Sequence, residues 1–246
     1  LIFISMRKYL FLLSALCLLA MTFLLPSAHA QKTKKAPAPA AQLTTAVLVQ
    51  IVKAEDERRW DKTLETLLKS ASAAVRARAA LAVGRIGDEA AIGPLGAMLE
   101  TDTDAGVRAM AAFALGEIES ATASSVIIKA LANEKESEDV RARAIEAAGK
   151  IAAATKETAK ESADALGEAV LDAMEAESIK AKNSKPIVLM GLTAILRVRP
   201  EDGDFIAAKF LVDLDPRVRA TTANTLSRLR AKNSNETLRL LLMSDE

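Results

Sequence analysis

The chain has 246 residues, with 33 Lys and Arg against 32 Asp and Glu, so its formal charge at pH 7 is only +1. It contains one histidine, one cysteine and 3% aromatic residues. A near-neutral chain with so few aromatic side chains lacks the basic surface and the stacking rings on which nucleic-acid-binding domains depend.

Residues 1–30 have the pattern of a secretory signal peptide. A short basic region at residues 6–8 is followed by an apolar run, and the sequence AHA ending at Ala30 has the small-residue form of a cleavage site. We therefore expect an exported protein, periplasmic or secreted, that is cut after Ala30 and does not stay in the membrane. The alternative is an uncleaved membrane anchor, although the apolar run is short for a membrane span.

Cleavage would remove the only histidine, cysteine and tyrosine, which are His29, Cys17 and Tyr9, and would change the net charge to −1. A chain without His or Cys lacks the ligands of the usual zinc and haem sites, and it cannot form a Ser-His-Asp or Cys-His catalytic group. It has no glycine-rich phosphate loop, and no pair of carboxylates stands out from those that solvate helices. We expect a non-catalytic segment with no cofactor and no metal.

Residues 31–42, QKTKKAPAPAAQ, read as a basic, Pro/Ala-rich and extended linker. Residues 43–55 are predicted to form a helix that caps the first end of a repeat domain covering residues 43–246. Trp60 follows this cap. At the start of a helix it is better explained as a packing anchor between the cap and the first repeat than as a binding residue.

The stretch VRARAALAVGRIGD at residues 75–88 recurs along the chain. Its copies begin at Val75, Val107, Val140, Pro186 and Val218, which are 32, 33, 46 and 32 residues apart. A period near 33 residues indicates a stack of helical repeats. The 46-residue step contains about 13 residues more than the period typical of such arrays.

Each copy is predicted to be a helix because its apolar residues follow helical spacing. In the first copy they are Val75, Ala79, Val83 and Ile86, separated by four, four and three residues. A residue that can cap a helix lies three positions before the start of each copy. These residues are Ser72, Asp104, Ser137, Asn183 and Asp215.

A helix of this length is marginal alone, so each copy needs a partner helix before it. We call the partner helix A and the copy helix B. Helices A are predicted at residues 60–68, 91–99, 124–131 and 205–214. In residues 152–183, where the pattern is interrupted, the stripe Leu166, Val170, Leu171 and Met174 predicts another, with the extra residues extending the preceding loop or the helices.

Residues 235–242 are predicted to form a further helix A. The sequence then stops where the next copy is due, which favours a C-terminal truncation over a natural last helix that caps the stack. The predicted fold is all-α, an α-solenoid of antiparallel helix pairs with four to five repeats.

The pattern D/S-x-x-V-R-x-x-A-A-x-A-L-G-x-I-G-D, preceded by a helix A, resembles the bacterial HEAT-repeat family, in particular the short type called PBS-lyase HEAT-like. The resemblance covers roughly residues 60–242 and is most specific in the first three copies. It implies a scaffold that holds a protein partner on a curved surface. The family spans scaffolds, adaptors and some enzymes, so the resemblance carries little information about activity.

A second resemblance concerns residues 53–61, KAEDERRWD, ahead of the repeats. This start is similar to that of exported bacterial proteins in which HEAT-like repeats precede a cyclophilin-type peptidyl-prolyl isomerase domain. The alternative function is therefore the repeat arm of such an isomerase, with the catalytic domain beyond Glu246. A phycobilin-lyase relative is a third interpretation, and the predicted export counts against it.

The B helices line the concave face in HEAT-like arrays, so their exposed positions are the candidate binding surface. Positions three and ten residues into each copy lie on one helix face. They hold Arg78/Arg85, Met110/Glu117, Arg143/Lys150, Leu189/Leu196 and Thr221/Arg228. A mixed stripe of this kind favours a protein or peptide partner over nucleic acid. The predicted partner-binding residues are Arg78, Arg85, Arg143, Lys150 and Arg228.

Two further positions recur in register. The position after the first residue of each copy holds Arg76, Arg108, Arg141 and Arg219, with Ile187 as the exception. These arginines either bind anions or pair with acidic residues of neighbouring repeats, and the regular repetition favours pairing. Gly84, Gly116 and Gly149 recur at one position of helix B, which indicates close helix packing.

Overall fold

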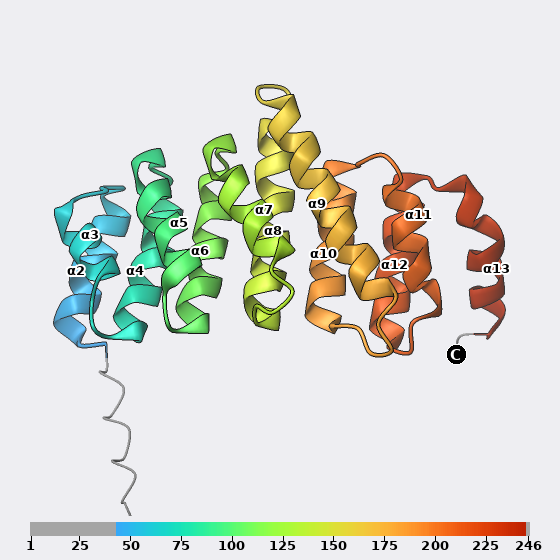
Figure 1. The fold of residues 1–246 in the computed structure, drawn as a ribbon, viewed down its shortest axis with the longest axis horizontal. Coiled ribbons are helices and arrows are strands. Elements are labelled where there is room, and N and C mark those ends of the chain that lie inside the picture. Colours follow the sequence, from blue (N-terminus) through green and yellow to red (C-terminus); the bar gives the residue numbers. More distant parts are fainter. Residues whose placement is uncertain (1–42, 245–246) are drawn as a thin grey trace, which may run out of the picture. The chain divides into compact units, whose positions relative to one another are not determined.

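The computed structural model describes residues 43–244, and within that range every regular element is a helix. The first half contains α2 (Thr45–Asp56), α3 (Lys62–Leu68), α4 (Ala73–Ile86), η2 (Glu89–Ala91), α5 (Ile92–Thr101), α6 (Ala105–Ile118), η3 (Ala121–Ala123) and α7 (Ser124–Ala132). The second half contains α8 (Glu138–Thr155), α9 (Lys160–Ser178), α10 (Lys185–Val198), α11 (Gly203–Ala208), η4 (Lys209–Val212), α12 (Pro216–Leu229), η5 (Lys232–Ser234) and α13 (Asn235–Ser244) (Figure 1). The predicted all-α class is confirmed.

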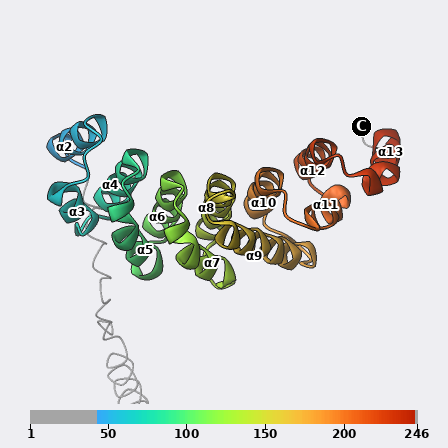
Figure 2. The same cartoon turned by 90° about the horizontal axis from the view of Figure 1, so that it is seen from above.

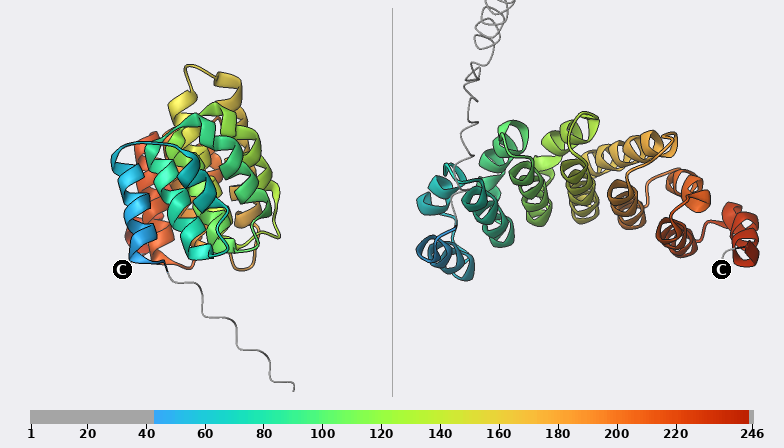
Figure 3. Two further views of the ribbon diagram at one scale, coloured as in Figure 1. Left: turned by 90° about the vertical axis from the view of Figure 1, so that its left-hand side faces the viewer. Right: turned by 90° about the horizontal axis from the view of Figure 1, so that it is seen from below.

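The helices of residues 43–244 lie in two rows (Figure 2, Figure 3). The B row runs through α4, α6, α8, α10 and α12, each packed on the next, and α2 packs on α4 at its first end. The A row runs through α3, α5, α7, α9 and α11, each packed on the B helix that follows it. Within residues 43–244 the B row lies on the inner side of a gentle bend (Figure 2), as the solenoid interpretation predicts.

The core lies between the two rows and is built from the predicted stripes. Val75, Ala79, Val83 and Ile86 of α4 are all buried. The equivalent residues of α6 and α8 are buried as well, except for Ile118, which is partly buried against the core. Each B helix, and α2 as well, begins after a side chain that accepts a hydrogen bond from the backbone N–H three residues on. Ser72, Asp104 and Ser137 do this for α4, α6 and α8, so the predicted caps of these copies are confirmed.

The recurring glycines let neighbouring B helices approach closely. A Cβ atom added to Gly84 would lie 2.7 Å from the Cα of Ala114, and one added to Gly116 would lie 2.7 Å from the Cα of Ala147. Real Cβ atoms do not come so close, so only glycine fits here without a shift of the helix. A Cβ atom added to the third glycine, Gly149, would lie 2.8 Å from the Cβ and 3.0 Å from the Cα of Ala194.

The contact with Ala194 corrects the register of the fourth copy. Ala114 and Ala147 are the seventh residues after Val107 and Val140, so Ala194 makes Ile187, not Pro186, the equivalent first position. Ser184, not Asn183, is the N-cap of α10, and Pro186 occupies the first turn, where no N–H donor is needed. The error arose because two adjacent residues could both cap. In the corrected register Val188 takes the arginine position, and Met190 and Arg197 replace Leu189 and Leu196.

The extra residues of the long step lengthen two helices. α8 has 18 residues and α9 has 19, against 14 for α4 and α6. The predicted stripe of α9 faces the core, with Leu166, Val170 and Met174 buried and Leu171 partly buried against them. Of the two predicted alternatives, a longer loop or longer helices, the structure shows longer helices.

The first described helix, α2, packs on α4 at the first end of the B row, where the cap was predicted. Trp60 is partly buried and packs against the core. The predicted signal peptide at residues 1–30 and the linker at residues 31–42 lie outside the described residues. Across residues 43–244, none of the helices combines the length and apolar character that a membrane crossing requires.

Candidate interaction surface

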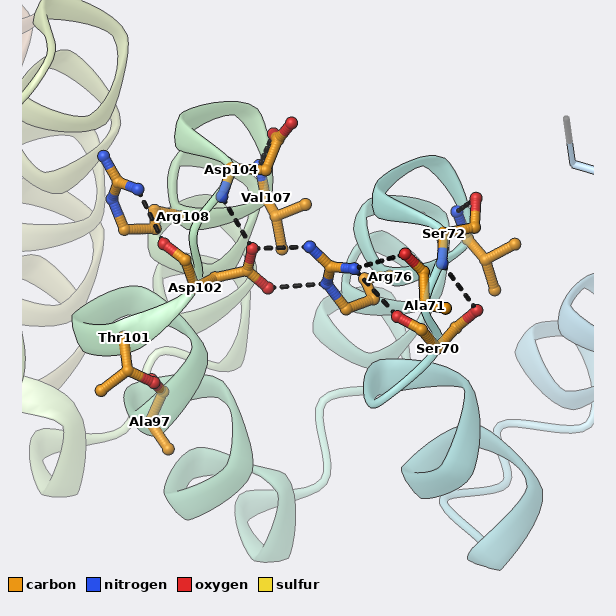
Figure 4. Close-up of polar contacts among 11 residues, drawn as sticks. Ser70, Ala71, Ser72, Arg76, Ala97, Thr101, Asp102, Asp104, Val107 and Arg108 are labelled. Carbon is orange, nitrogen blue, oxygen red and sulfur yellow. Dashed lines mark hydrogen bonds and ion pairs between the residues drawn. The ribbon is translucent and has the colours of Figure 1, made fainter. Parts of the chain in front are cut away.

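The repeated arginines form a ladder along the edge where the B helices begin. Arg76 donates from Nε and Nη2 to the two carboxylate oxygens of Asp102, both at 2.7 Å, and from Nη1 to the carbonyls of Ser70 and Ala71 (Figure 4). Arg108 makes the same two-pronged pair with Glu136, at 2.8 and 2.7 Å, and its Nη1 donates to the Asp102 carbonyl. Each rung therefore joins a B helix to the loop before the next one.

The later rungs are less regular. Arg141 donates at 3.1 Å to Glu177, whose fully buried carboxylate also receives Lys180 and the backbone N–H of Ser184. Arg219 donates to the carbonyls of Asp213 and Leu214. The interpretation of the ladder as a structural device is therefore confirmed for Arg76, Arg108 and Arg141, because each of them pairs with a carboxylate of the same fold.

The electrostatics of the ladder agree with its geometry. Burial raises the pKa of Asp102, but hydrogen bonds from Arg76 and from the N–H of Asp104 outweigh it and hold that pKa below the ordinary value. The hydrogen bond from Arg108 lowers the pKa of Glu136. Both carboxylates thus stay ionised at neutral pH and hold their arginines.

The first two predicted partner-binding residues, Arg78 and Arg85, lie together on α4 and share one carboxylate. Arg78 Nη2 lies 2.6 Å and Arg85 Nη1 lies 2.7 Å from the two oxygens of Glu55 on α2. Arg78 is mostly buried, whereas about half of the Arg85 side chain, 54%, stays exposed. Arg78 thus ties α2 to the stack, and Arg85 reaches solvent.

Arg143 and Lys150 gather around a ring that the sequence analysis did not select. Lys150 Nζ lies 4.6 Å from the centre of the Phe113 ring, and Arg143 Cζ lies 5.2 Å from it. Glu146 bridges the two cations at 2.6 and 2.7 Å, and Glu117 contacts Lys150 at 2.6 Å. The position six residues into each copy, which holds Phe113, lies on the same helix face as the third and tenth. If the sequence analysis had included this sixth position in the candidate surface, it would have identified Phe113.

Arg228 differs from the other four predicted residues. It is exposed on the last turn of α12, and within residues 43–244 no carboxylate pairs with its guanidinium group. Its neighbour at the equivalent position of α10 is Arg197, which the wrong register of the fourth copy had hidden. The structure therefore divides the predicted set, because four of its cations are neutralised internally and one is not.

The described residues offer no evident centre for chemistry. Residues 43–244 contain no cluster of three or more His, Cys, Asp or Glu side chains that could hold a metal ion. The shifted carboxylate pKa values on the inner face belong to salt bridges. Burial raises the pKa of Glu146, but hydrogen bonds from Lys150 and Arg143 outweigh it.

Comparison with known proteins agrees with this architecture. The sequence pattern of HEAT repeats matches residues 45–109 and 92–178, which together span more than half of the chain. The chain belongs to the HEAT-repeat family. The match ends before α10, which agrees with the weaker motif of the last two copies. No curated protein matches this HEAT-repeat chain in sequence.

Two solved structures resemble the HEAT-repeat chain in fold. The complex of CpcE and CpcF of phycocyanin lyase from Nostoc sp. has a TM-score of 0.56 at 20% identity, covering 75% of this chain and 71% of that one. An engineered protein has a TM-score of 0.52 at 20% identity, covering 79% of this chain and 90% of that one. Likenesses at this identity show a shared helical solenoid and nothing about activity.

Proposed function

We propose that this HEAT-repeat chain is a non-catalytic scaffold that holds a protein or peptide partner on the face of its B helices. One observation carries the proposal. Positions three, six and ten of five consecutive B helices form a continuous row of partly or fully exposed side chains. Solenoids of this kind use such extended concave surfaces for binding.

The chemistry of the face favours a protein partner. Its first half combines the Phe113 ring and Met110 with cations and carboxylates that are already paired, which suits an amphipathic segment better than a phosphate backbone. The ladder edge is a poorer candidate, because Arg76, Arg108 and Arg141 are held by internal carboxylates.

Export belongs to the same proposal. Residues 1–30 carry the signal-peptide pattern, so we place the scaffold in the periplasm or outside the cell, without a nucleic-acid partner and without a membrane anchor after cleavage. The isomerase-arm alternative rests on the resemblance at residues 53–61 and stays a prediction. Reading the gene beyond the codon for Glu246 tests it.

Site-specific photocrosslinking tests which face binds. A benzophenone side chain at Thr193, which is exposed on the B face of α10, should give covalent adducts with a defined protein in cells that make the chain. The same group at Ala97, exposed on α5 of the A row, is the matched control. Adducts at Ala97 but not at Thr193 would place the partner on the other face and overturn the proposal.

A further inference from the structure

The last two B helices carry a cluster of cations at the edge where the B helices end. We name this cluster the basic edge. Its members come from the end of α10, the end of α12 and the link to α13. They are Arg197, Arg199, Arg228, Arg230 and Lys232, and all five are exposed.

Neighbouring helices bring these residues together. α10 packs against α12, and Arg199 Nη2 donates at 3.3 Å to the backbone carbonyl of Arg228. Arg197 and Arg228 hold the same position in adjacent B helices, so one interhelical spacing, about 8–10 Å, separates their Cα positions. Arg230 and Lys232 follow within four residues of Arg228.

Few carboxylates neutralise this edge. Residues 216–235 contain five Lys and Arg and no Asp or Glu, in contrast to the near-equal balance of the whole chain. Within residues 43–244, no ion pair joins Arg197, Arg199, Arg228, Arg230 or Lys232 to a carboxylate. The acids that follow Arg199 in the chain, Glu201 and Asp202, line a cavity of about 560 Å³ against α9, together with Lys156, Lys160 and Arg199. Arg199 therefore borders acidic neighbours, while the other four cations do not share that cavity. The acid nearest to Lys232 in the chain is Glu236 of α13, which lies 4.0 Å from Arg239.

The contrast with the first half of the face is direct. There Arg78 and Arg85 meet Glu55, and Lys150 meets Glu117 and Glu146. The same fold thus pairs its inner-face cations in the first repeats and leaves those of α10 and α12 open to solvent.

Two members of the basic edge lie at left-handed backbone positions. Arg199 and Arg230 are the C-cap residues of α10 and α12 and adopt left-handed φ values of 54° and 59°. The equivalent residue is Gly87, at φ 78°, after α4 and Glu119, at φ 57°, after α6. A cation in the last turn of a helix interacts favourably with the helix dipole. A left-handed C-cap conformation is unfavourable for arginine, so the dipole does not explain why arginine rather than glycine occupies these two positions. Glu119 shares this conformation, so the backbone at Arg199 and Arg230 does not by itself single out the basic edge.

We infer that the basic edge binds an acidic segment of the protein partner. The inference rests on the proposed scaffold function and locates one anchor of it. An acidic protein segment fits better than nucleic acid, because the cations occupy one end of a near-neutral chain and the basic edge itself contains no aromatic residue on which bases could stack. Exposed charges of this kind guide and orient a partner, and their effect weakens with salt.

The probe is a fluorescein-labelled decamer of glutamate, titrated with the full chain and followed by fluorescence anisotropy. The variant R197Q/R228Q/R230G/K232Q should raise the dissociation constant about tenfold or more. The matched control K53Q/K62Q/K69Q/K129Q removes four exposed lysines elsewhere and should change it less than about twofold. Raising the salt from 50 to 300 mM should weaken binding to the wild type and erase its difference from the variant.

R230G separates function from folding. Glycine is favoured at this φ, so the thermal midpoint should stay level or rise while peptide binding falls. The inference is overturned if the peptide does not bind, if the control loses as much affinity, or if stability falls with binding. It is also overturned if a single-stranded dT20 oligonucleotide or a phosphatidylserine vesicle binds this edge more tightly than the peptide. If any of these outcomes occurred while the benzophenone side chain at Thr193 still gave adducts, the scaffold proposal would stand and only the acidic anchor would be lost.

Discussion

A missing Cβ atom sets the distance between neighbouring B helices. Gly84, Gly116 and Gly149 each lie against an alanine of the next helix, and a methyl group at any of them would come within about 3 Å of that alanine. The contact is backbone against backbone, so no flexible side chain can move aside. Small residues on both sides of the contact are thus a requirement of the stack.

Gly116→Ala should destabilise the chain, even though alanine is the better helix former. The added Cβ would lie 2.7 Å from the Cα of Ala147, so α6 and α8 must separate. Overpacking of this kind costs about 1–3 kcal/mol, more than the gain of about 1 kcal/mol in helix propensity. Urea unfolding followed by circular dichroism measures the difference.

Gly93→Ala is the control for this prediction. Gly93 lies in α5 with no atom within 4 Å of the added Cβ. The change should be neutral or should stabilise the chain by up to about 1 kcal/mol. If both variants behaved alike, the close approach of α6 and α8 would not limit the stack.

The sequence revealed this glycine position but did not reveal the register of the fourth copy. Asn183 and Ser184 can both cap a helix, and Pro186 fits any position of the first turn. The decisive fact is the contact of Gly149 with Ala194, which depends on how two helices pack. A repeat pattern fixes the period, but packing between copies fixes the residue.

At the scale of the elements, the arginine ladder joins successive repeats through pairs of increasing span. The acid that Arg76 meets lies 26 residues on, the acid of Arg108 lies 28 residues on, and the acid of Arg141 lies 36 residues on. The sequence predicted pairing but not the partners, because each acid lies in or near the turn after a helix A of different length. The long α9 brings in Glu177, from its own last turn.

Substituting only one partner of the buried pair of Arg141 and Glu177 should lower the free energy of unfolding. Arg141→Met leaves the fully buried Glu177 carboxylate with only Lys180 and the Ser184 N–H as partners. We expect a loss of about 3 kcal/mol in the free energy of unfolding, as for other half-removed buried pairs. The double variant R141M/E177Q should lose less, because the one charge that it leaves unpaired, Lys180, is exposed, and because Arg141 Nε has no partner even in the native protein.

A double-mutant cycle by urea unfolding measures this coupling. The control is Lys129→Met, which breaks the exposed pair with Glu100 and should change stability by less than about 0.5 kcal/mol. A loss for Arg141→Met no larger than for Lys129→Met would mean that the third rung does not hold the long repeat to its neighbour.

At the scale of the molecule, the main helix contacts within residues 43–244 join each repeat to its neighbours, so the stability of the array is approximately a sum of repeats and of the interfaces between neighbours. Ion pairs reinforce several of those interfaces. Asp102 and Glu136 belong to the ladder, and Glu55 joins α2 to α4. Glu146 holds Lys150 of its own helix α8, and Lys150 in turn pairs with Glu117 of α6. The pKa values held below their ordinary values are those of Glu55, Asp102, Glu136 and Glu146. The periodic sequence predicted the stack, whereas these links arise only once the helices are in place.

Acid should therefore loosen the whole array. A carboxylate whose folded-state pKa is lowered contributes stability above its unfolded-state value, about 4, and loses that contribution as the pH falls through the folded-state value. In that range the unfolded chain binds more protons, so the urea midpoint should be level from pH 7 to about 5 and fall steeply below about pH 4. The variant D102N/E136Q should start lower at pH 7, because Arg76 and Arg108 lose charged partners, and should show a shallower fall. Parallel curves for the two proteins would show that the ladder carboxylates do not drive the acid response.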